Sequence, residues 1–306
     1  MTPILLAILS GCALVLAAPF VRDRLLPLPN PAEAKGRFGE LSQGRTHYRW
    51  FGAGEGPVYV AVHGLSTPCD AYQAIGERIA TAGGRLLTYD LYGRGFSDRA
   101  AGRQDRAFHQ RQLLDLLADQ GVTEPFVIMG YSMGGIIATQ FAADHPTRVR
   151  GVVLLTAAGT KTIESRSLGM IHSNRFLGTW LYLVTGMGGL AKGIAAARGE
   201  HVDVPDIHDI QAAQIGYRGY GPALASSVQG MIGKALDNEH RALAEAKVPV
   251  LALWGALDDV IALEAKDTLS RFNPAAENAV FEDAGHGLPY THADYATAVI
   301  LRRWPI

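Results

Sequence analysis

The sequence predicts an α/β protein built on a mostly parallel, eight-stranded sheet with helices on both faces. Short apolar, β-branched runs recur along the chain, and they are continuous rather than alternating, as in strands buried on both faces. Longer segments with helical spacing separate these runs, as crossovers between parallel strands require. The 306 residues are 48% hydrophobic and 19% charged, so the chain can bury a large core and is too apolar to be disordered.

The predicted elements follow one another in the order that such a sheet needs. Two early strands, near residues 37–41 and 46–51, are expected to form an antiparallel edge. The later strands are expected at residues 57–63, 85–90, 125–131, 151–156, 248–254 and 278–282. Helical spacing occurs at residues 72–82, 105–120, 133–144, 263–272 and 292–303.

A long interval separates two of the buried strands. About 90 residues lie between Thr156 and Val248 without a clear strand, far more than a crossover of roughly a dozen requires. The interval predicts an inserted helical cap, in which the apolar, glycine-interrupted stretch 176–191 would form lid helices facing a pocket or a bilayer surface. The expected domains are a core of residues 36–158 and 247–306 and a cap of residues 159–246.

The N-terminal segment 1–22 has the composition of a membrane anchor or a signal-like segment. Residues 3–21 carry no charge, and this run of 19 residues is close to the roughly 20 that cross a bilayer as a helix. Arg22 and Arg24 follow at once. Residues 23–35 are expected to be a linker, extended over its proline-containing stretch 25–34. We expect an uncleaved single span. Cleavage as a signal peptide, lipidation of Cys12 and the side of the membrane on which the body lies stay open.

Charge and cysteine content exclude other classes of protein. A net charge of −1, with 28 basic and 29 acidic residues, provides no electrostatic footprint for nucleic acid. Two cysteines, Cys12 and Cys69, do not make a disulfide framework.

Gly130-Tyr131-Ser132-Met133-Gly134 is a G-x-S-x-G sequence where a buried strand meets an amphipathic helix. Glycines at both ends allow a sharp turn that exposes the serine hydroxyl at the carboxyl edge of the sheet. The alternative is a glycine-rich turn whose serine caps the helix. The context favours Ser132 as a nucleophile.

A serine nucleophile needs a base and an acid that orients the base. Of ten histidines, His286 alone sits in a glycine-flanked loop directly after the last predicted strand, and the other nine are expected at packing or surface positions. Asp258 and Asp259 follow the strand at 248–254, and both are candidates for the acid. Backbone amides of Leu65 and Met133 are expected to form an oxyanion hole, on the basis of position alone.

These motifs resemble the α/β-hydrolase superfamily, and within it capped serine esterases and lipases of the monoacylglycerol-lipase kind. The resemblance runs from about residue 37 to 304 and is carried jointly by His63-Gly64, Asp90-Leu-Tyr-Gly-Arg-Gly-Phe-Ser97, the serine motif, Trp254-Gly-x-x-Asp258 and Gly285-His286. It implies the α/β-hydrolase fold, selects Asp258 over Asp259, and implies a structural role for residues 90–97. A serine at position 132 argues against dehalogenases and epoxide hydrolases, which have an aspartate there.

The sequence therefore predicts a serine hydrolase that cleaves carboxylic esters of hydrophobic acyl substrates, with a small-molecule ester or a lipid as substrate and the membrane as a partner through residues 3–21. The alternatives are a carbon–carbon bond hydrolase of diketones and a ligand-binding member of the fold without turnover. Acyl length and oligomeric state are not specified. The chemistry needs no cofactor or metal. The acids and histidines from His201 to Asp209 have a spacing that fits no metal motif, and this stretch is expected to be a polar loop and the start of a helix in the cap.

Overall fold

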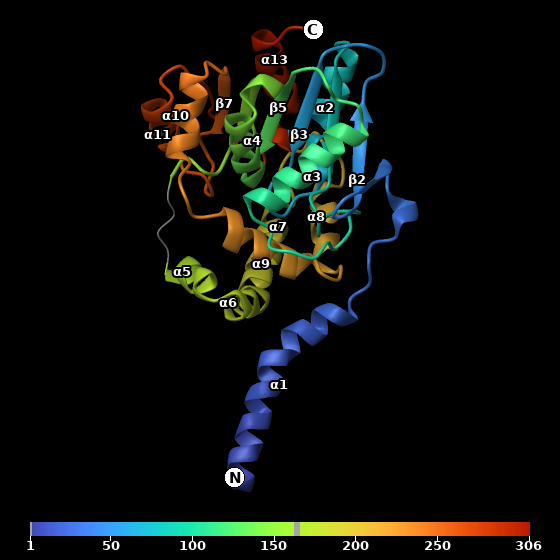
Figure 1. The fold of residues 1–306 in the computed structure, drawn as a ribbon, viewed down its shortest axis with the longest axis vertical. Helices are drawn as coiled ribbons and strands as arrows, with labels where there is room; N and C mark the ends of the chain where they lie inside the picture. Colours follow the sequence, from blue (N-terminus) through green and yellow to red (C-terminus); the bar gives the residue numbers. More distant parts are fainter. Residues whose placement is uncertain (1, 162–165) are drawn as a thin grey trace.

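The computed structural model describes residues 2–161 and 166–306. Its sheet has the strand order β1-β2-β4-β3-β5-β6-β7-β8 (Figure 1). The strands are β1 (Arg37–Leu41), β2 (Gly44–Phe51), β3 (Val58–Val62), β4 (Arg85–Tyr89), β5 (Phe126–Tyr131), β6 (Val149–Leu155), β7 (Val250–Gly255) and β8 (Glu277–Phe281). β1 and β2 pair antiparallel, β2 pairs antiparallel with β4, and the remaining pairs are parallel. The predicted fold class, including the antiparallel edge, is confirmed.

Helices cover both faces of the sheet because its central strands are apolar on both sides. In β3, Val60 and Val62 pack into one core cluster while Tyr59 and Ala61 pack into the other, as the two-residue period of a strand requires. The first cluster is completed by α3 (Arg106–Asp119), α4 (Met133–Asp144), α10 (Asp237–Glu245) and α11 (Ala265–Phe272), and the second by α2 (Gln73–Thr81) and α13 (Ala293–Arg303).

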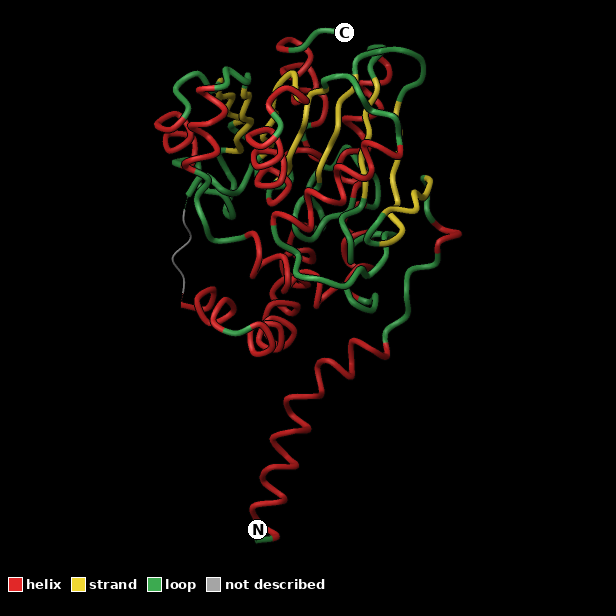
Figure 2. Tube along the Cα trace, viewed as in Figure 1, coloured by secondary structure: helices red, strands yellow, loops and turns green. Residues whose placement is uncertain are grey.

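The cap helices gather at one end of the sheet, as the ribbon and the tube both show (Figures 1 and 2). They are α5 (Arg166–Ser173), α6 (Arg175–Leu181), the π-helical turn η4 (Tyr182–Gly186), α7 (Met187–Ala197), α8 (Ile207–Ile215) and α9 (Tyr220–Met231). The expected cap range 159–246 is wider than this group. Its residues 162–165 lie outside the described residues, and α10 packs on α4 and α11 with Leu243 in the core, so the segment before β7 belongs with the core.

The N-terminal helix α1 (Pro3–Leu25) projects away from the sheet and passes the cap (Figure 1). None of its residues is buried, and its mean hydropathy of 2.6 makes it, by length and composition, a candidate membrane span. The expected linker bound at residue 23 falls inside this helix, which continues through Leu25. Its last turn is held by the cap, where the Gly219 N–H donates to the Asp23 carboxylate at 3.0 Å.

The shorter elements lie in the connections. They are η1 (Pro31–Glu33), η2 (Cys69–Tyr72), η3 (Pro146–Arg148) and α12 (Leu288–Thr291).

His240 on α10 makes the stability of the fold sensitive to pH. Its side chain is 1% exposed, and within the described residues neither ring nitrogen has a hydrogen-bond partner. Burial lowers the pKa of His240 to about 4 from its ordinary value of 6.5. The unfolded chain therefore takes up this proton first as the pH falls, and the free energy of unfolding decreases between pH 6.5 and 4.

Between about pH 7.5 and about pH 5, we expect the free energy of unfolding of wild type to fall by about 2 kcal/mol more than that of His240→Leu. Urea unfolding at the two pH values measures this difference. His201→Leu is the matched control, because that side chain is 85% exposed, and it should leave the wild-type difference unchanged. Equal differences in wild type and His240→Leu would show that this imidazole is not held neutral by burial.

Candidate active site

Ser132 occupies a strained turn between β5 and α4. Its φ of 51° and ψ of −120° are rare for a residue with a side chain. The turn depends on the flanking glycines. A Cβ at Gly130 would lie 2.4 Å from the Gly134 carbonyl oxygen, and one at Gly134 would lie 2.1 Å from the Val62 carbonyl oxygen. The Ser132 N–H donates to the Leu155 carbonyl at 3.1 Å, so the turn is braced by both neighbouring strands.

Three side chains from distant parts of the sequence form a hydrogen-bonded chain beside this turn. The Ser132 Oγ lies 3.0 Å from His286 Nε2, and His286 Nδ1 lies 2.9 Å from Asp258 Oδ2. Asp258 follows β7 and His286 follows β8, so both loops leave the same carboxyl edge of the sheet as Ser132. The predicted serine, histidine and first aspartate are thus brought together, while Asp259 is exposed beside them.

Backbone contacts hold the acid and the base in place. The Asp258 side chain is 1% exposed, and its Oδ1 accepts the N–H groups of Val260 and Ile261, each at 2.8 Å. This leaves Oδ2 facing the imidazole. The His286 side chain is 20% exposed, so the ring is open enough to meet a substrate.

Two supports of His286 have no signal in the sequence. The Thr156 hydroxyl, at the end of β6, donates to the His286 carbonyl at 3.1 Å. The Tyr131 ring packs on the imidazole with centroids 5.4 Å apart. Their neighbourhood depends on the order of the strands, in which β6 lies between β5 and β7, and no local pattern reveals that order.

The loop after β3 passes over the serine. A Cβ at Gly64 would lie 3.2 Å from the Ser132 Cβ, so the backbone that leads into Leu65 runs next to the nucleophile position. Among the described residues, the N–H groups of Leu65 and Met133 have no hydrogen-bond acceptor. Both amides are therefore available to an oxygen that develops negative charge near Ser132.

His63 is a packing residue that shapes this loop. It is fully buried, and burial lowers its pKa to about 4. Its Nε2 accepts the Leu91 N–H at 2.9 Å, and its Nδ1 lies 2.8 Å from the Gly64 carbonyl oxygen. A neutral ring that accepts at Nε2 carries its proton on Nδ1, so it donates to Gly64 and links the loop to β4.

Arg94 ties the same loop to the cap. Its guanidinium is fully buried, its Nε donates to the Leu65 carbonyl at 3.0 Å, and its Nη2 donates to the Ser227 hydroxyl of α9 at 2.8 Å. Burial lowers the pKa of this group to about 10. In the described part of the chain no carboxylate pairs with it, so neutral oxygens alone satisfy the cation. The sequence assigned the Asp90–Ser97 loop a structural role but gave no sign of this contact.

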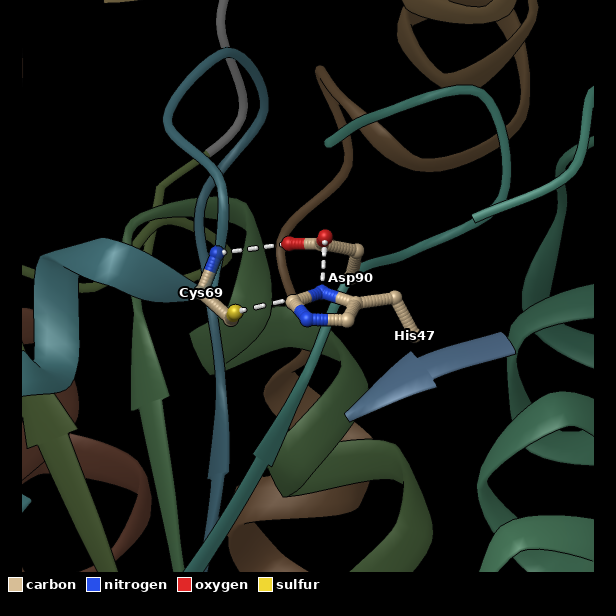
Figure 3. A group of neighbouring side chains, drawn as sticks. All are labelled: His47, Cys69 and Asp90. Atoms are coloured by element: carbon tan, nitrogen blue, oxygen red, sulfur yellow. Dashed lines mark hydrogen bonds and ion pairs between the residues drawn. The ribbon is translucent and has the colours of Figure 1, made fainter. Parts of the chain in front are cut away.

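Three other buried groups lie close together on β2, η2 and the end of β4 (Figure 3). His47 Nδ1 lies 2.7 Å from Asp90 Oδ2, the Cys69 N–H donates to Asp90 Oδ1 at 2.9 Å, and the Cys69 sulfur lies 4.0 Å from the same ring nitrogen. Burial alone would raise the pKa of Asp90, but the adjacent His47 holds it below its ordinary value.

These contacts do not suit a metal ion. Both Asp90 oxygens already accept a backbone N–H, the second from Phe96 at 3.0 Å, and burial raises the pKa of the Cys69 thiol, which disfavours the thiolate that a metal would need. The contacts among His47, Cys69 and Asp90 hold the loop after β4 in place.

The polar stretch from His201 to Asp209 serves the contact between cap and core. Asp203 accepts the Ala293 N–H at 2.6 Å, and its own N–H donates to the Tyr290 carbonyl at 2.7 Å. His208 lies 3.2 Å from the Gln211 side chain, and Gln211 in turn donates to the Thr67 hydroxyl at 2.8 Å. These residues join the cap to the loop after β3 and to α12 and α13.

Comparison with known proteins agrees with this fold. The family model described as serine aminopeptidase, S33, matches residues 56–201. Lipase 1 of Psychrobacter immobilis is 24% identical over 243 residues, which cover 76% of this chain and 71% of the lipase. A pimeloyl-[acyl-carrier protein] methyl ester esterase of Aliivibrio salmonicida is 25% identical over 256 residues, which cover 81% of this chain and 92% of the esterase.

A solved structure extends the likeness to almost the whole chain. The crystal structure of a membrane phospholipase A superposes with a TM-score of 0.70 at 18% identity, covering 98% of this chain and 94% of that one. The sheet and this superposition show the α/β-hydrolase fold, and the family match over residues 56–201 together with relatives named lipase and esterase supports a hydrolase.

Proposed function

We propose that this protein is a serine esterase that cleaves carboxylic esters of hydrophobic acyl groups through an acyl-enzyme. The observation that carries the proposal is the Ser132 Oγ at 3.0 Å from His286 Nε2, with Asp258 at 2.9 Å on the other ring nitrogen. A hydroxyl becomes a useful nucleophile only when a base takes its proton, and this geometry supplies the base and the group that orients it.

In the proposed mechanism, Ser132 attacks the ester carbonyl while His286 accepts the hydroxyl proton. Asp258 holds the proton on His286 Nδ1, so Nε2 is free to accept, and it stabilises the imidazolium that forms. The N–H groups of Leu65 and Met133 stabilise the oxyanion. His286 then protonates the departing alcohol, and water activated by the same ring hydrolyses the acyl-enzyme.

A hydrophobic acyl group is supported by the cap and by the relatives. The stretch 176–191 carries no charge, and the two relatives above are named for a lipase and for a methyl ester esterase whose acyl group is linked to a carrier protein. We further propose that residues 3–21 anchor the chain in a membrane, which would place the cap close to lipid esters.

Pre-steady-state hydrolysis of p-nitrophenyl esters of increasing acyl length tests this function. We expect a burst of p-nitrophenol equal to the concentration of active sites, followed by many turnovers, with kcat/KM rising with acyl length. A burst without further turnover would identify a ligand-binding protein. Turnover of a vinylogous diketone in the absence of ester turnover would identify a carbon–carbon bond hydrolase.

A further inference from the structure

The cap contacts α1 inside the apolar run of that helix. The indole Nε1 of Trp180, on α6, donates to the Val15 carbonyl at 3.2 Å. The Phe20 and Phe176 rings stack with centroids 5.1 Å apart. The Gly219 N–H bonds to Asp23 near the end of the same helix. α1 is therefore seated on the cap from Val15 to its last turn.

The length of α1 decides where these contacts lie relative to a bilayer. At about 1.5 Å per residue, the 19 uncharged residues 3–21 extend about 28 Å, close to the roughly 30 Å thickness of the hydrocarbon layer. If α1 spans the bilayer, its whole uncharged stretch therefore lies within the hydrocarbon layer. Val15 lies six residues before Val21, so its carbonyl would lie about 9 Å inside the apolar layer. Trp180, bonded to that carbonyl, would lie at a similar depth.

The surface of the cap next to α1 has the composition that such a position requires. Phe176, Leu177 and Val184 are each about half exposed, and between Arg175 and Lys192 the chain carries no charge. An exposed apolar face is typical of helices that lie in the membrane interface, where that face enters the bilayer by roughly 5–10 Å.

A cavity of about 1160 Å³ lies between α1 and the cap. Val15 and Pro19 line it from α1, Trp180 and Met187 from α6 and α7, and Arg22 and Arg198 also line it. Apolar walls suit an acyl chain. Arg198 is paired with Asp209, and Asp23, which also lines the cavity, accepts the Gly219 N–H, so the guanidinium offered to the phosphate of a lipid headgroup is that of Arg22. Neither Ser132 nor His286 lines this cavity, so it is separate from the candidate active site.

We propose that α6, η4 and α7 insert into the bilayer beside α1, and that an acyl chain of a bilayer phospholipid occupies the cavity between them. The inference rests on the membrane-anchor part of the proposed function and is independent of the ester chemistry.

Tryptophan quenching in vesicles tests the insertion. The full chain is reconstituted into vesicles of phosphatidylcholine and phosphatidylglycerol whose acyl chains are brominated near their middle, because bromine quenches indoles that it contacts. We expect brominated lipid to quench the fluorescence that Trp180 contributes to wild type. The fluorescence of Trp180→Phe should be the same in brominated and unbrominated vesicles. The other three tryptophans are present in both proteins and cancel in the comparison: Trp50 lies on β2 of the sheet, and Trp254 and Trp304 are 1% and 5% exposed.

An activity ratio provides an independent readout. Leu177→Asp is expected to lower the turnover of a long-chain ester in vesicles, relative to p-nitrophenyl butyrate in solution, on the order of tenfold. Tyr295→Asp is the matched control, since Tyr295 is 55% exposed and lies on α13, at the end of the molecule away from α1 (Figure 1). It should leave the ratio unchanged.

Two results would overturn the inference. Wild-type protein that sediments with brominated vesicles but keeps its Trp180 fluorescence would have its cap outside the bilayer. Protein that does not associate with vesicles would lack the anchor as well. In both cases turnover of p-nitrophenyl butyrate in detergent shows separately whether the proposed ester chemistry holds.

Discussion

Ser132→Ala is expected to lower kcat/KM for p-nitrophenyl butyrate by at least about 1,000-fold, because it removes the atom that would form the acyl-enzyme. Any remaining rate would come from binding and from the Leu65 and Met133 amides. Since alanine fits the space of the serine, the fold should persist, which a thermal melt checks. A fluorophosphonate probe, which labels activated serines, should label wild type at this position and leave the variant unlabelled.

Ser270→Ala is the control for this substitution. Ser270 lies on α11, where its hydroxyl donates to the Lys266 carbonyl at 3.0 Å, and it has no contact with the candidate site among the described hydrogen bonds. This variant should keep wild-type turnover and labelling. Ester turnover by Ser132→Ala at the wild-type rate would require a different nucleophile and would end the site assignment.

Asp258→Asn is expected to reduce kcat by about 10,000-fold with little loss of stability. The asparagine oxygen can still accept the N–H groups of Val260 and Ile261, as Asp258 Oδ1 does at 2.8 Å, so its amide nitrogen would face His286 Nδ1. An amide that donates to Nδ1 moves the imidazole proton to Nε2, and a protonated Nε2 cannot accept the proton of Ser132. Steady-state kinetics near neutral pH measures the effect.

Asp259→Asn distinguishes the two adjacent carboxylates. Asp259 is exposed, and its carboxylate makes no described contact with His286, so we expect kcat within about twofold of wild type. The reverse result, in which Asp259→Asn inactivates the enzyme and Asp258→Asn does not, would make Asp259 the orienting acid.

Local patterns in the sequence were sufficient for much of this fold. The continuous apolar runs located the buried strands to within about two residues, since a strand buried on both faces must be apolar at every position. The residues flanking Ser132 were informative for a similar reason, because Gly130 and Gly134 pack against backbone oxygens that would collide with any side chain. Such requirements belong to single positions, and a sequence displays them directly.

Two segment boundaries were predicted incorrectly from the sequence. The linker was expected to begin at residue 23, but α1 continues to Leu25, and Asp23 in its last turn contacts the cap. The cap was expected to include α10, whose packing on α4 assigns it to the core. Both errors arise from contacts with segments far away in the sequence.

By itself the sequence determined the fold class, the approximate positions of the strands, and the candidates Ser132, His286 and the pair Asp258 and Asp259, because each depends on hydrophobic periodicity or on residue types near one strand end. The structure places Asp258 against His286, as the resemblance implied. Tertiary structure alone decided that Thr156 and Arg94 support the site and that Trp180 meets α1 at Val15. These are distances between side chains from separate elements, and they are set by how the elements pack together rather than by any local pattern.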